Sequence, residues 1–330
     1  MQLWYKNSDV PSDFGDTAVT IGIFDGMHKG HSEILAQTVA AARKRGIKAV
    51  ALTFEPHPRI VHNPETNLKL VISLADRLAR LEAAGIDAVF VQKYNLEFAA
   101  TEPLDFIENI LIRVLHAKAV VVGEDVRFGR GNSGDGKLLA EYGKEFGIQV
   151  KIISDLCDES GRRWSSTWVR ELLADGDVAG AAKVLGRPHR IRGVVEHGFK
   201  RGRELGFPTA NLSGDGLGEV PAQGVYAGWL VQDVPGAKAV INLPAAISIG
   251  MNPQFGGERM TVEAHVLGRS DLNLYGKEIA IDFIDYLRPM MKFDSVTALL
   301  TQMDQDLRNC ALILGVPVAC RVNPKDVTAQ

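Results

Sequence analysis

The chain has 330 residues, of which 46% are apolar and 23% are charged, and its formal net charge is −3. The length exceeds that of one typical domain, so two domains are expected, and the composition is that of a globular protein rather than a disordered one. The near-neutral charge argues against nucleic-acid binding, and the absence of an apolar run of about 18 residues argues against a membrane span. Three widely spaced cysteines and a start without an apolar signal segment predict a cytoplasmic protein without disulfides or a zinc site.

The first half alternates short apolar segments with segments of helical periodicity. Strands are expected at 18–22, 49–54, 88–92, 119–123 and 149–154, and helices at 32–45, 74–84, 104–116 and 137–146. Because the strand segments are apolar throughout, they should be buried on both faces, and their alternation with helices favours an α/β doubly wound parallel sheet. Ligands of such sheets bind beyond the carboxyl ends of the strands, so the loops that follow the strands are the candidate site.

The loop after the first strand reads GIFDGMHKGH, from Gly22 to His31, and leads into a helix. His28 and His31 are three residues apart, so both rings can lie on one side of the first helical turn. Gly26 and Gly30 allow tight turns, and the helix N-terminus adds free N–H groups and a positive dipole end. This combination favours a polyphosphate site, while an ordinary polar loop or a metal-binding histidine pair is the alternative. The glycine spacings of a dinucleotide fold or a P-loop are absent.

Three later loops should reach the same edge of the sheet. TFEPHPRI carries His57 between two prolines, and VVVGEDVRFGRGNSGD carries Asp125. RRWSSTWVREL carries Ser166, Thr167 and Arg170. The hydroxyl residues would cap the helix that follows, with Arg170 in its first turn, and a purely structural role for this segment is equally open.

In this order, GxFDGxHxGH, TFxPHP, GxDxRFGxxxxGD and SSTxVR resemble the adenylyltransferase half of bacterial bifunctional riboflavin kinase/FMN adenylyltransferases. The resemblance implies that His28 and His31 bind the ATP phosphates and stabilise the transition state together with an arginine of the last motif. His57 would lie near the transferred phosphate or the flavin, and Val126 departs from the Phe that the family usually has. The residues implied to complete the nucleotide pocket are Gly22, Phe24, Asp25, Gly30, Asp125, Ser166, Thr167 and Arg170.

Beyond residue 186 the pattern changes to short segments between turns. Strands are expected at 189–197, 225–231, 245–249, 261–267 and 278–284, followed by a helix at 294–314 and a tail from about 316. Residues 186–276 hold 16 of the 33 glycines, and this turn-rich spacing predicts an antiparallel barrel or sandwich. We therefore place the two domains at 1–185 and 186–330.

The second half opens with a basic glycine loop, FKRGRELG, followed by PTAN. Lys200, Arg201 and Arg203 lie between glycines and could approach a polyphosphate. Thr209 and Asn211 share one face of an extended segment, and their hydroxyl and amide oxygens suit Mg²⁺ that already carries phosphate. The alternative is a turn in which both side chains bond their own backbone.

A carboxylate stands within the apolar strand pattern VEAHV. Glu263 shares a strand face with Thr261 and His265, and a carboxylate that points into a barrel mouth is a candidate general base for a hydroxyl nucleophile. The alternative is an outward-facing, solvated glutamate.

These motifs, with GVYAGW, SIGMNPQFGG and LRPMMKFDS, are similar to the riboflavin kinase module of the same family. The resemblance implies a six-stranded antiparallel barrel with a terminal helix, in which Glu263 takes the proton of the ribityl 5′-hydroxyl. It also implies that Arg288 lines the flavin side, while Gln254 and the pair Met290–Met291 depart from the usual motifs. The residues implied to bind Mg²⁺ are Thr209 and Asn211, and those around the nucleotide are Lys200, Arg201, Gly202 and Pro208.

The combined prediction is one enzyme that phosphorylates riboflavin to FMN and adenylylates FMN to FAD, with ATP as co-substrate and Mg²⁺ as cofactor. Neither nucleic acid nor a membrane is expected as a partner, and a homo-oligomer is left open. Two other functions stay open at this point. One is nucleotidyl transfer to a different acceptor, which the first half alone would allow. The other is a flavin-binding regulator without turnover, for which the Met290–Met291 departure is the only support.

Overall fold

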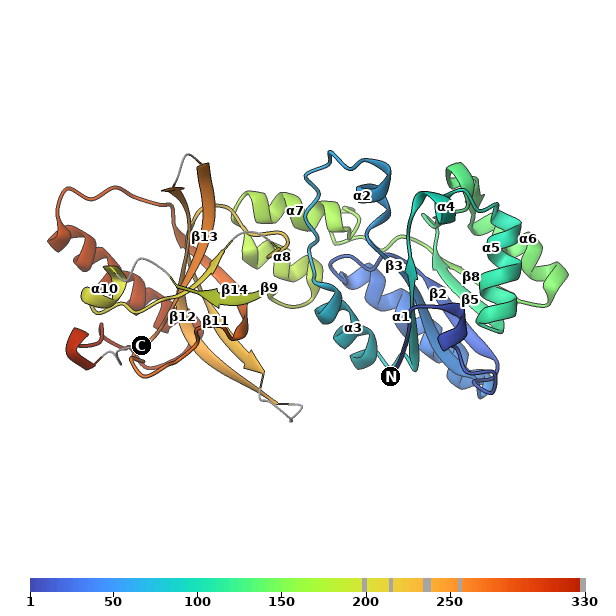
Figure 1. Ribbon diagram of the computed structural model, residues 1–330, viewed down its shortest axis with the longest axis horizontal. Helices are drawn as coiled ribbons and strands as arrows, with labels where there is room; N and C mark the ends of the chain where they lie inside the picture. The colour runs from blue at the N-terminus through green and yellow to red at the C-terminus, as the bar shows by residue number, and fades with distance from the viewer. Residues whose placement is uncertain (198–200, 214–215, 234–238, 255–256, 327–330) are drawn as a thin grey trace. The chain divides into compact units, whose positions relative to one another are not determined.

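The computed structural model describes residues 1–197, 201–213, 216–233, 239–254 and 257–326 (Figure 1). The chain divides by its internal contacts into two compact units. The first unit consists of Met1–Leu70 and Leu74–Ser166, and the second of Val71–Ser73 and Thr167–Gln330. The sequence-based boundary at residue 185 marks where the pattern of elements changes rather than which residues pack together, and it stays a prediction. No helix in the described ranges has both the length and the hydropathy needed to cross a bilayer.

A six-stranded parallel sheet forms the centre of the first unit. Its strands are β1 (Gln2–Trp4), β2 (Thr17–Ile21), β3 (Lys48–Glu55), β4 (Ala88–Lys93), β5 (Ala117–Gly123) and β8 (Gln149–Ile153). They lie in the order β1-β4-β3-β2-β5-β8, and every neighbouring pair is parallel. Five of these strands confirm the predicted segments. The edge strand β1 was not predicted, because three residues carry no usable periodicity.

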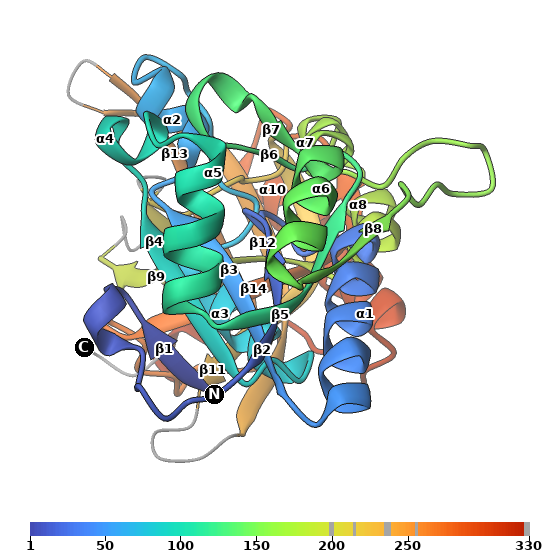
Figure 2. The same cartoon turned by 90° about the vertical axis from the view of Figure 1, so that its right-hand side faces the viewer.

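Helices cover both faces of this sheet, as the doubly wound prediction requires. They are α1 (Lys29–Arg45), α3 (Leu74–Ala83), α5 (Pro103–Phe106), which continues into a π-helical segment at Ile107–Val114, and α6 (Gly136–Phe146). Figures 1 and 2 show α1 and α3 on one face and α5 and α6 on the other. The loops add the short helices α2 (Pro58–His62) and α4 (Leu96–Ala99) and a small ladder of β6 (Arg127–Phe128) and β7 (Gly134–Asp135).

The strand order places a topological switch point between β2 and β5. From β2 the chain proceeds outward through β3 and β4, and it then returns to place β5 on the other side of β2. In open α/β sheets, ligands bind beyond the carboxyl ends of the strands at such a switch point. The predicted nucleotide segments at 22–31 and 120–135 include the loops that follow these two strands.

The second unit contains a closed antiparallel barrel. Its strands are β9 (His189–Glu196), β10 (Ala210–Ser213), β11 (Gly224–Asp233), β12 (Val240–Gln254), β13 (Gly257–Val266) and β14 (Glu278–Arg288). The order around the barrel is β10-β13-β12-β11-β14-β9, and β9 closes it by pairing with β10. The helices are α7 (Ser166–Ala174), which begins at the boundary between the units, α8 (Val178–Leu185), α9 (Arg201–Glu204) and α10 (Val296–Leu314). Periodicity found five of the strands, and β10 supplies the sixth that the family resemblance implied.

The terminal helix α10 packs against β11, β12 and β14, with Leu307 and Cys310 buried in the contact. The Ser295 hydroxyl caps its first turn by accepting from the Ala298 N–H at 3.1 Å. The tail beyond α10 returns to the barrel, because the Val322 N–H donates to the Gly206 carbonyl at 3.1 Å. The tail thus lies against the loop that precedes the PTAN segment.

Phe90 on β4 tests the core of the first unit, because its ring is only 1% exposed. The change Phe90→Ala should cost about 3–5 kcal/mol of stability through the cavity that it leaves. Hydrogen exchange at increasing denaturant should show earlier loss of protection in the parallel strands and unchanged protection in the barrel strands. Leu96→Ala, at a position that is 64% exposed, is the control and should change neither. Equal protection of wild type and Phe90→Ala would contradict the packing of this core.

Candidate active sites

The turn between β2 and α1 has an unusual backbone. Phe24 has a φ of 54° and Met27 a φ of 48°, values that a residue with a side chain rarely adopts, and Gly26 between them has a φ of 83°. Gly22 is required next to them, because a Cβ there would lie 2.8 Å from the Phe24 ring. The turn therefore folds back on itself and directs the chain into α1.

This turn brings His28 and His31 together at the start of α1. His28 is the N-cap residue of the helix, and the two imidazole rings stack with centroids 3.8 Å apart and planes at 25°. The Phe24 ring meets His31 edge-on at 5.4 Å, and Gly30 leaves room for the His28 ring, which a Cβ there would approach to 3.1 Å. Two imidazoles at a helix N-terminus form a site suited to an anion. Phe24 is buried, so any ligand contact from this residue would come from its backbone.

A hydroxyl of the SSTWVR segment supports the same turn. The Ser166 side chain donates a hydrogen bond to the carbonyl of Asp25, which is itself buried. Lys29 places its ammonium group 4.6 Å from the centroid of the Trp164 ring. Ser166 therefore supports the backbone of the turn that precedes the two histidines, and its place in the nucleotide pocket stays a prediction.

The loop after β5 carries a charged cluster that the sequence analysis named only in part. Asp125 forms an ion pair with Arg163, and the Arg163 Nε lies 3.0 Å from Asp155 Oδ1. Burial raises the pKa of Asp155. Arg163 lies in the RRWSST motif, but the motif does not indicate which carboxylates it contacts.

His57 lies at the carboxyl end of β3, where it caps α2. Its Nδ1 accepts from the Arg59 N–H at 3.0 Å, so the proton of the neutral ring lies on Nε2. The cap gives His57 a structural task that the sequence did not indicate. Its proposed place near the phosphate or the flavin stays a prediction.

Thr167 and Arg170 belong to the second unit. Thr167 is exposed, and the Arg170 Nε lies 3.5 Å from Glu219 Oε2. Because α7 begins at Ser166, Arg170 is its fifth residue and stands at the start of the second turn rather than in the first turn as expected. Their roles in the nucleotide pocket stay predictions.

In the barrel, strand register joins the two predicted functional segments. Asn211 on β10 pairs with Glu263 on β13. The Thr209 hydroxyl donates to Glu263 Oε2 at 3.3 Å, and the Asn211 amide lies 3.2 Å from the Thr209 carbonyl and 3.3 Å from its hydroxyl. A hydroxyl, an amide and a carboxylate thus form one cluster. Burial raises the pKa of Glu263, and the Thr209 bond offsets only part of that effect.

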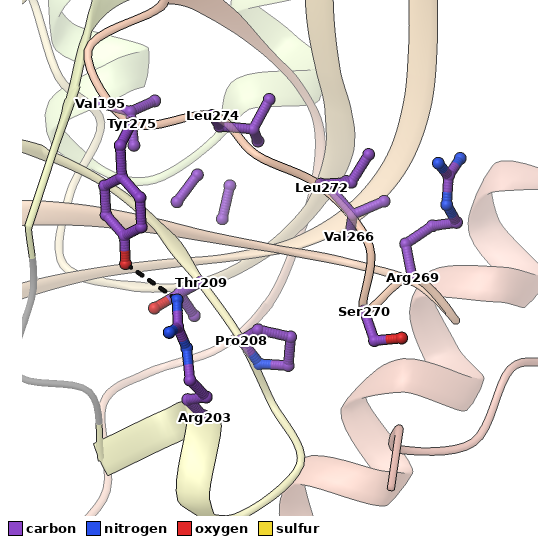
Figure 3. A pocket seen from close by; sticks show the side chains of 12 residues that line it. Val195, Arg203, Pro208, Thr209, Val266, Arg269, Ser270, Leu272, Leu274 and Tyr275 are labelled. Atoms are coloured by element: carbon purple, nitrogen blue, oxygen red, sulfur yellow. Dashed lines mark hydrogen bonds between the residues drawn. The ribbon is translucent and has the colours of Figure 1, made fainter. Parts of the chain in front are cut away.

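Two cavities meet at this cluster. The small cavity, of about 40 Å³, is lined by Arg203, Pro208, Thr209 and Tyr275 among others (Figure 3). The Arg203 guanidinium donates to the Tyr275 hydroxyl at 3.2 Å, and Figure 3 shows this bond between two of the residues that line the cavity. The large cavity, of about 240 Å³, is mostly apolar and is also bordered by Thr209. Thr209 therefore lines both cavities.

The large cavity has a charged pair in its wall. Arg288 Nη2 lies 2.7 Å from Asp306 Oδ2, and Asp306, on α10, is only 6% exposed at its side chain. Met290 and Met291 also line the cavity, and both are about half exposed. Arg288 thus lines this cavity, and its predicted place beside the flavin stays a prediction. Asp306 was missed, although an acid among the apolar positions of an amphipathic helix was the signal available.

The basic glycine loop is described only in part. Lys200 lies outside the described residues, and Arg201 begins α9. Glycine is required at position 202, because a Cβ there would lie 2.5 Å from the Phe207 carbonyl oxygen. The Pro208 carbonyl accepts from Nδ1 of His265 at 2.8 Å. His265 is buried, and burial lowers its pKa, so the neutral ring with its proton on Nδ1 holds the backbone next to Thr209.

Comparisons with known proteins match a different family model to each half of the chain. A family model described as FAD synthetase matches residues 10–168, and one described as riboflavin kinase matches residues 185–314. The bifunctional riboflavin kinase/FMN adenylyltransferase of Escherichia coli (strain K12) is 35% identical over 288 residues, covering 87% of this chain and 90% of that protein. The protein of the same description from Listeria monocytogenes is 32% identical over 295 residues, with coverages of 87% and 89%. A solved structure described as a macrolide-efflux protein from Streptococcus pneumoniae has a TM-score of 0.80 at 31% identity, covering 92% of this chain and 96% of that one.

Glu263→Gln tests the electrostatics of the barrel cluster. Because the folded-state pKa of Glu263 is raised, the native state holds this proton more tightly than the unfolded state. The stability that Glu263 contributes is therefore complete below its ordinary pKa of 4.5 and falls as the pH rises through the folded-state value. We expect the free energy of unfolding of Glu263→Gln, measured relative to wild type by chemical unfolding, to be higher at pH 8 than at pH 5. Exposed Glu278→Gln on β14 should show no such trend, and a gain that shrinks toward pH 8 would contradict the assignment.

Proposed function

The chain belongs to the family of bifunctional riboflavin kinase/FMN adenylyltransferases, and we propose that its two reactions depend on the two residue clusters described above. It phosphorylates riboflavin with ATP to give FMN and ADP, and it transfers AMP from ATP to FMN to give FAD and pyrophosphate. The barrel cluster around Glu263 carries the kinase reaction. The histidine pair at the start of α1 carries the adenylyl transfer.

The observation that supports the kinase site most strongly is that Thr209 lines two cavities and contacts a half-buried carboxylate, Glu263. The small cavity, which has Arg203, Arg269 and the Thr209 hydroxyl in its wall, takes the ATP phosphates, and the apolar large cavity takes the flavin ring. The ribityl 5′-hydroxyl then lies at the junction, where Glu263 accepts its proton while the hydroxyl oxygen attacks the γ-phosphorus and ADP departs. Burial makes Glu263 a stronger base than an exposed carboxylate, because it raises the pKa.

The oxygen chemistry of the cluster fits Mg²⁺. Thr209 and Asn211 would hold the ion through a hydroxyl and an amide oxygen, which are hard ligands, while phosphate oxygens and water complete its coordination. No group of three or more His, Cys, Asp or Glu side chains in the described ranges could bind a metal without such help. When bound, the ion neutralises charge on the polyphosphate.

The histidine pair fits adenylyl transfer without a covalent intermediate. Negative charge grows on the α-phosphate and on the departing pyrophosphate, and prearranged donors stabilise that charge as the oxygen of FMN attacks. His28 and His31 are held in one stacked pair at the N-terminus of α1. Gly30, Asp25, Ser166 and Asp125 are proposed to shape the pocket. The roles of Thr167 and Arg170 rest on the SSTWVR motif alone.

His28→Ala should lower the rate of FAD formation by about 100–1,000-fold, because a prearranged donor to the transition state is lost. The same protein should still phosphorylate riboflavin at the wild-type rate, as separated flavins would show after incubation with riboflavin, ATP and Mg²⁺. Glu263→Gln is the reciprocal variant and should lose FMN formation by about 100-fold or more while it still adenylylates added FMN. Loss of both activities in a folded His28→Ala protein would contradict separate sites.

Thr209 offers a matched pair of variants for the metal. Thr209→Val removes the hydroxyl at nearly constant shape and should raise the Mg²⁺ concentration needed for half-maximal kinase rate. Thr209→Ser keeps the hydroxyl and should stay close to wild type. The Mg²⁺ dependence of FAD formation from added FMN is the internal control. An identical Mg²⁺ dependence for the Val and Ser variants would exclude Thr209 as a ligand.

A further inference from the structure

We propose that Arg77 is a positioning residue for adenylyl transfer, which acts by fixing the backbone turn that carries the histidine pair. Arg77 lies on α3, in none of the motifs of the nucleotide pocket, and its side chain is only 2% exposed. The inference rests on the proposed role of His28 and His31. It concerns what holds these rings rather than what they do.

The guanidinium of Arg77 joins two functional segments that are distant in the sequence. Its Nη1 donates to the Ile23 carbonyl at 2.8 Å, and its Nη2 donates to Glu55 Oε2 at 2.5 Å. Ile23 belongs to the turn after β2, and Glu55 is the last residue of β3, within the TFEPHP segment. The Thr53 hydroxyl donates to the same Ile23 carbonyl at 3.2 Å. A planar fork is needed to bind both acceptors at once, and only arginine supplies it.

Packing α3 against the sheet does not require a charge at this position. A buried guanidinium loses its hydration, so an apolar side chain of similar volume would serve the helix contact better. What the charge adds is two directed bonds to groups that α3 does not otherwise reach. The hydrogen bonds to the Ile23 carbonyl and to Glu55, rather than helix packing, therefore explain why a charged residue lies at position 77.

The bond to Ile23 acts at the strained point of the turn. The Ile23 carbonyl and the Phe24 N–H lie in one rigid peptide plane, and the φ of Phe24 is the rotation about the next bond. That φ is 54°, which the chain would leave if the plane were free to rotate. With the carbonyl held by Arg77 and Thr53, the plane is fixed and Phe24 keeps its left-handed conformation.

Phe24 then transmits this position to the histidines through direct contact. Its buried ring lies against Gly22 on one side and meets the His31 ring edge-on at 5.4 Å on the other. His31 in turn stacks on His28 at 3.8 Å. A rotation of the Ile23–Phe24 plane would therefore move both imidazoles, and a shift of about 1 Å in a catalytic group can cost about 100-fold in rate.

The test uses the full chain, in which the kinase reaction reports on protein concentration and on folding of the barrel. Arg77→Met keeps the volume and removes both bonds, and Arg77→Lys keeps the charge but not the fork. Both should lower kcat for FAD formation, the Met variant by about 100-fold and the Lys variant by about 10-fold, with KM for FMN within about threefold of wild type. The surface variant Arg43→Met also breaks an arginine–carboxylate pair of this unit, with Asp87, and should leave kcat unchanged.

Coupling to Phe24 separates positioning from general destabilisation. Phe24→Leu should lower kcat by itself, and the double variant with Arg77→Lys should be no slower than the slower single variant, because both changes act on the same turn. Effects that multiply would overturn the proposed path. A Lys variant with wild-type kcat would overturn the role of Arg77, even if Arg77→Met does not fold. If His28→Ala leaves FAD formation intact, the proposed function itself fails. If His28→Ala abolishes FAD formation while Arg77→Lys does not impair it, only this inference fails.

Discussion

A backbone turn that would not persist in isolation governs the first unit. Left-handed φ values at Phe24 and Met27 cost on the order of 1–3 kcal/mol each, and such strain survives only where surrounding structure determines it. That structure consists of the buried end of β2, the space left at Gly22, and the burial of the Phe24 ring. From this turn follow the start of α1 and the stacked histidines at its N-terminus.

In the barrel, strand register rather than a strained turn brings the polar residues of the candidate site together. Closure of the barrel requires β10 to pair with both β9 and β13, and the second pairing sets Asn211 opposite Glu263. Thr209 directly precedes β10 and lines both cavities of the barrel. In both units, the residues proposed to handle phosphate contact side chains from distant parts of the sequence or from the same turn.

Prediction from sequence succeeded where a residue's role depends on its neighbours along the chain. Apolar runs located the strands of the parallel sheet, because burial on both faces leaves a continuous apolar signature. It failed for β1 and β10, which are too short to show a period, and for α8, which the sequence analysis did not propose. The motifs named His28, His31, Thr209 and Glu263, because spacing along one helix turn or one strand face is local information. Arg163 and Asp306 were missed, since their carboxylate or guanidinium partners lie far away in the sequence.

The sequence by itself determined the class of each half, the order of the strands along the chain, the functional motifs and the family to which they belong. Only the tertiary structure decided which side chains meet. It showed that His28 and His31 stack, that Thr209 bonds Glu263, and that Arg77 binds the Ile23 carbonyl. The physical reason is that a hydrogen bond or an ion pair depends on distances of a few ångströms between groups that the chain brings together only when its sheets close. Local patterns indicate on which face of a helix or strand a residue lies, but not which residue it contacts there.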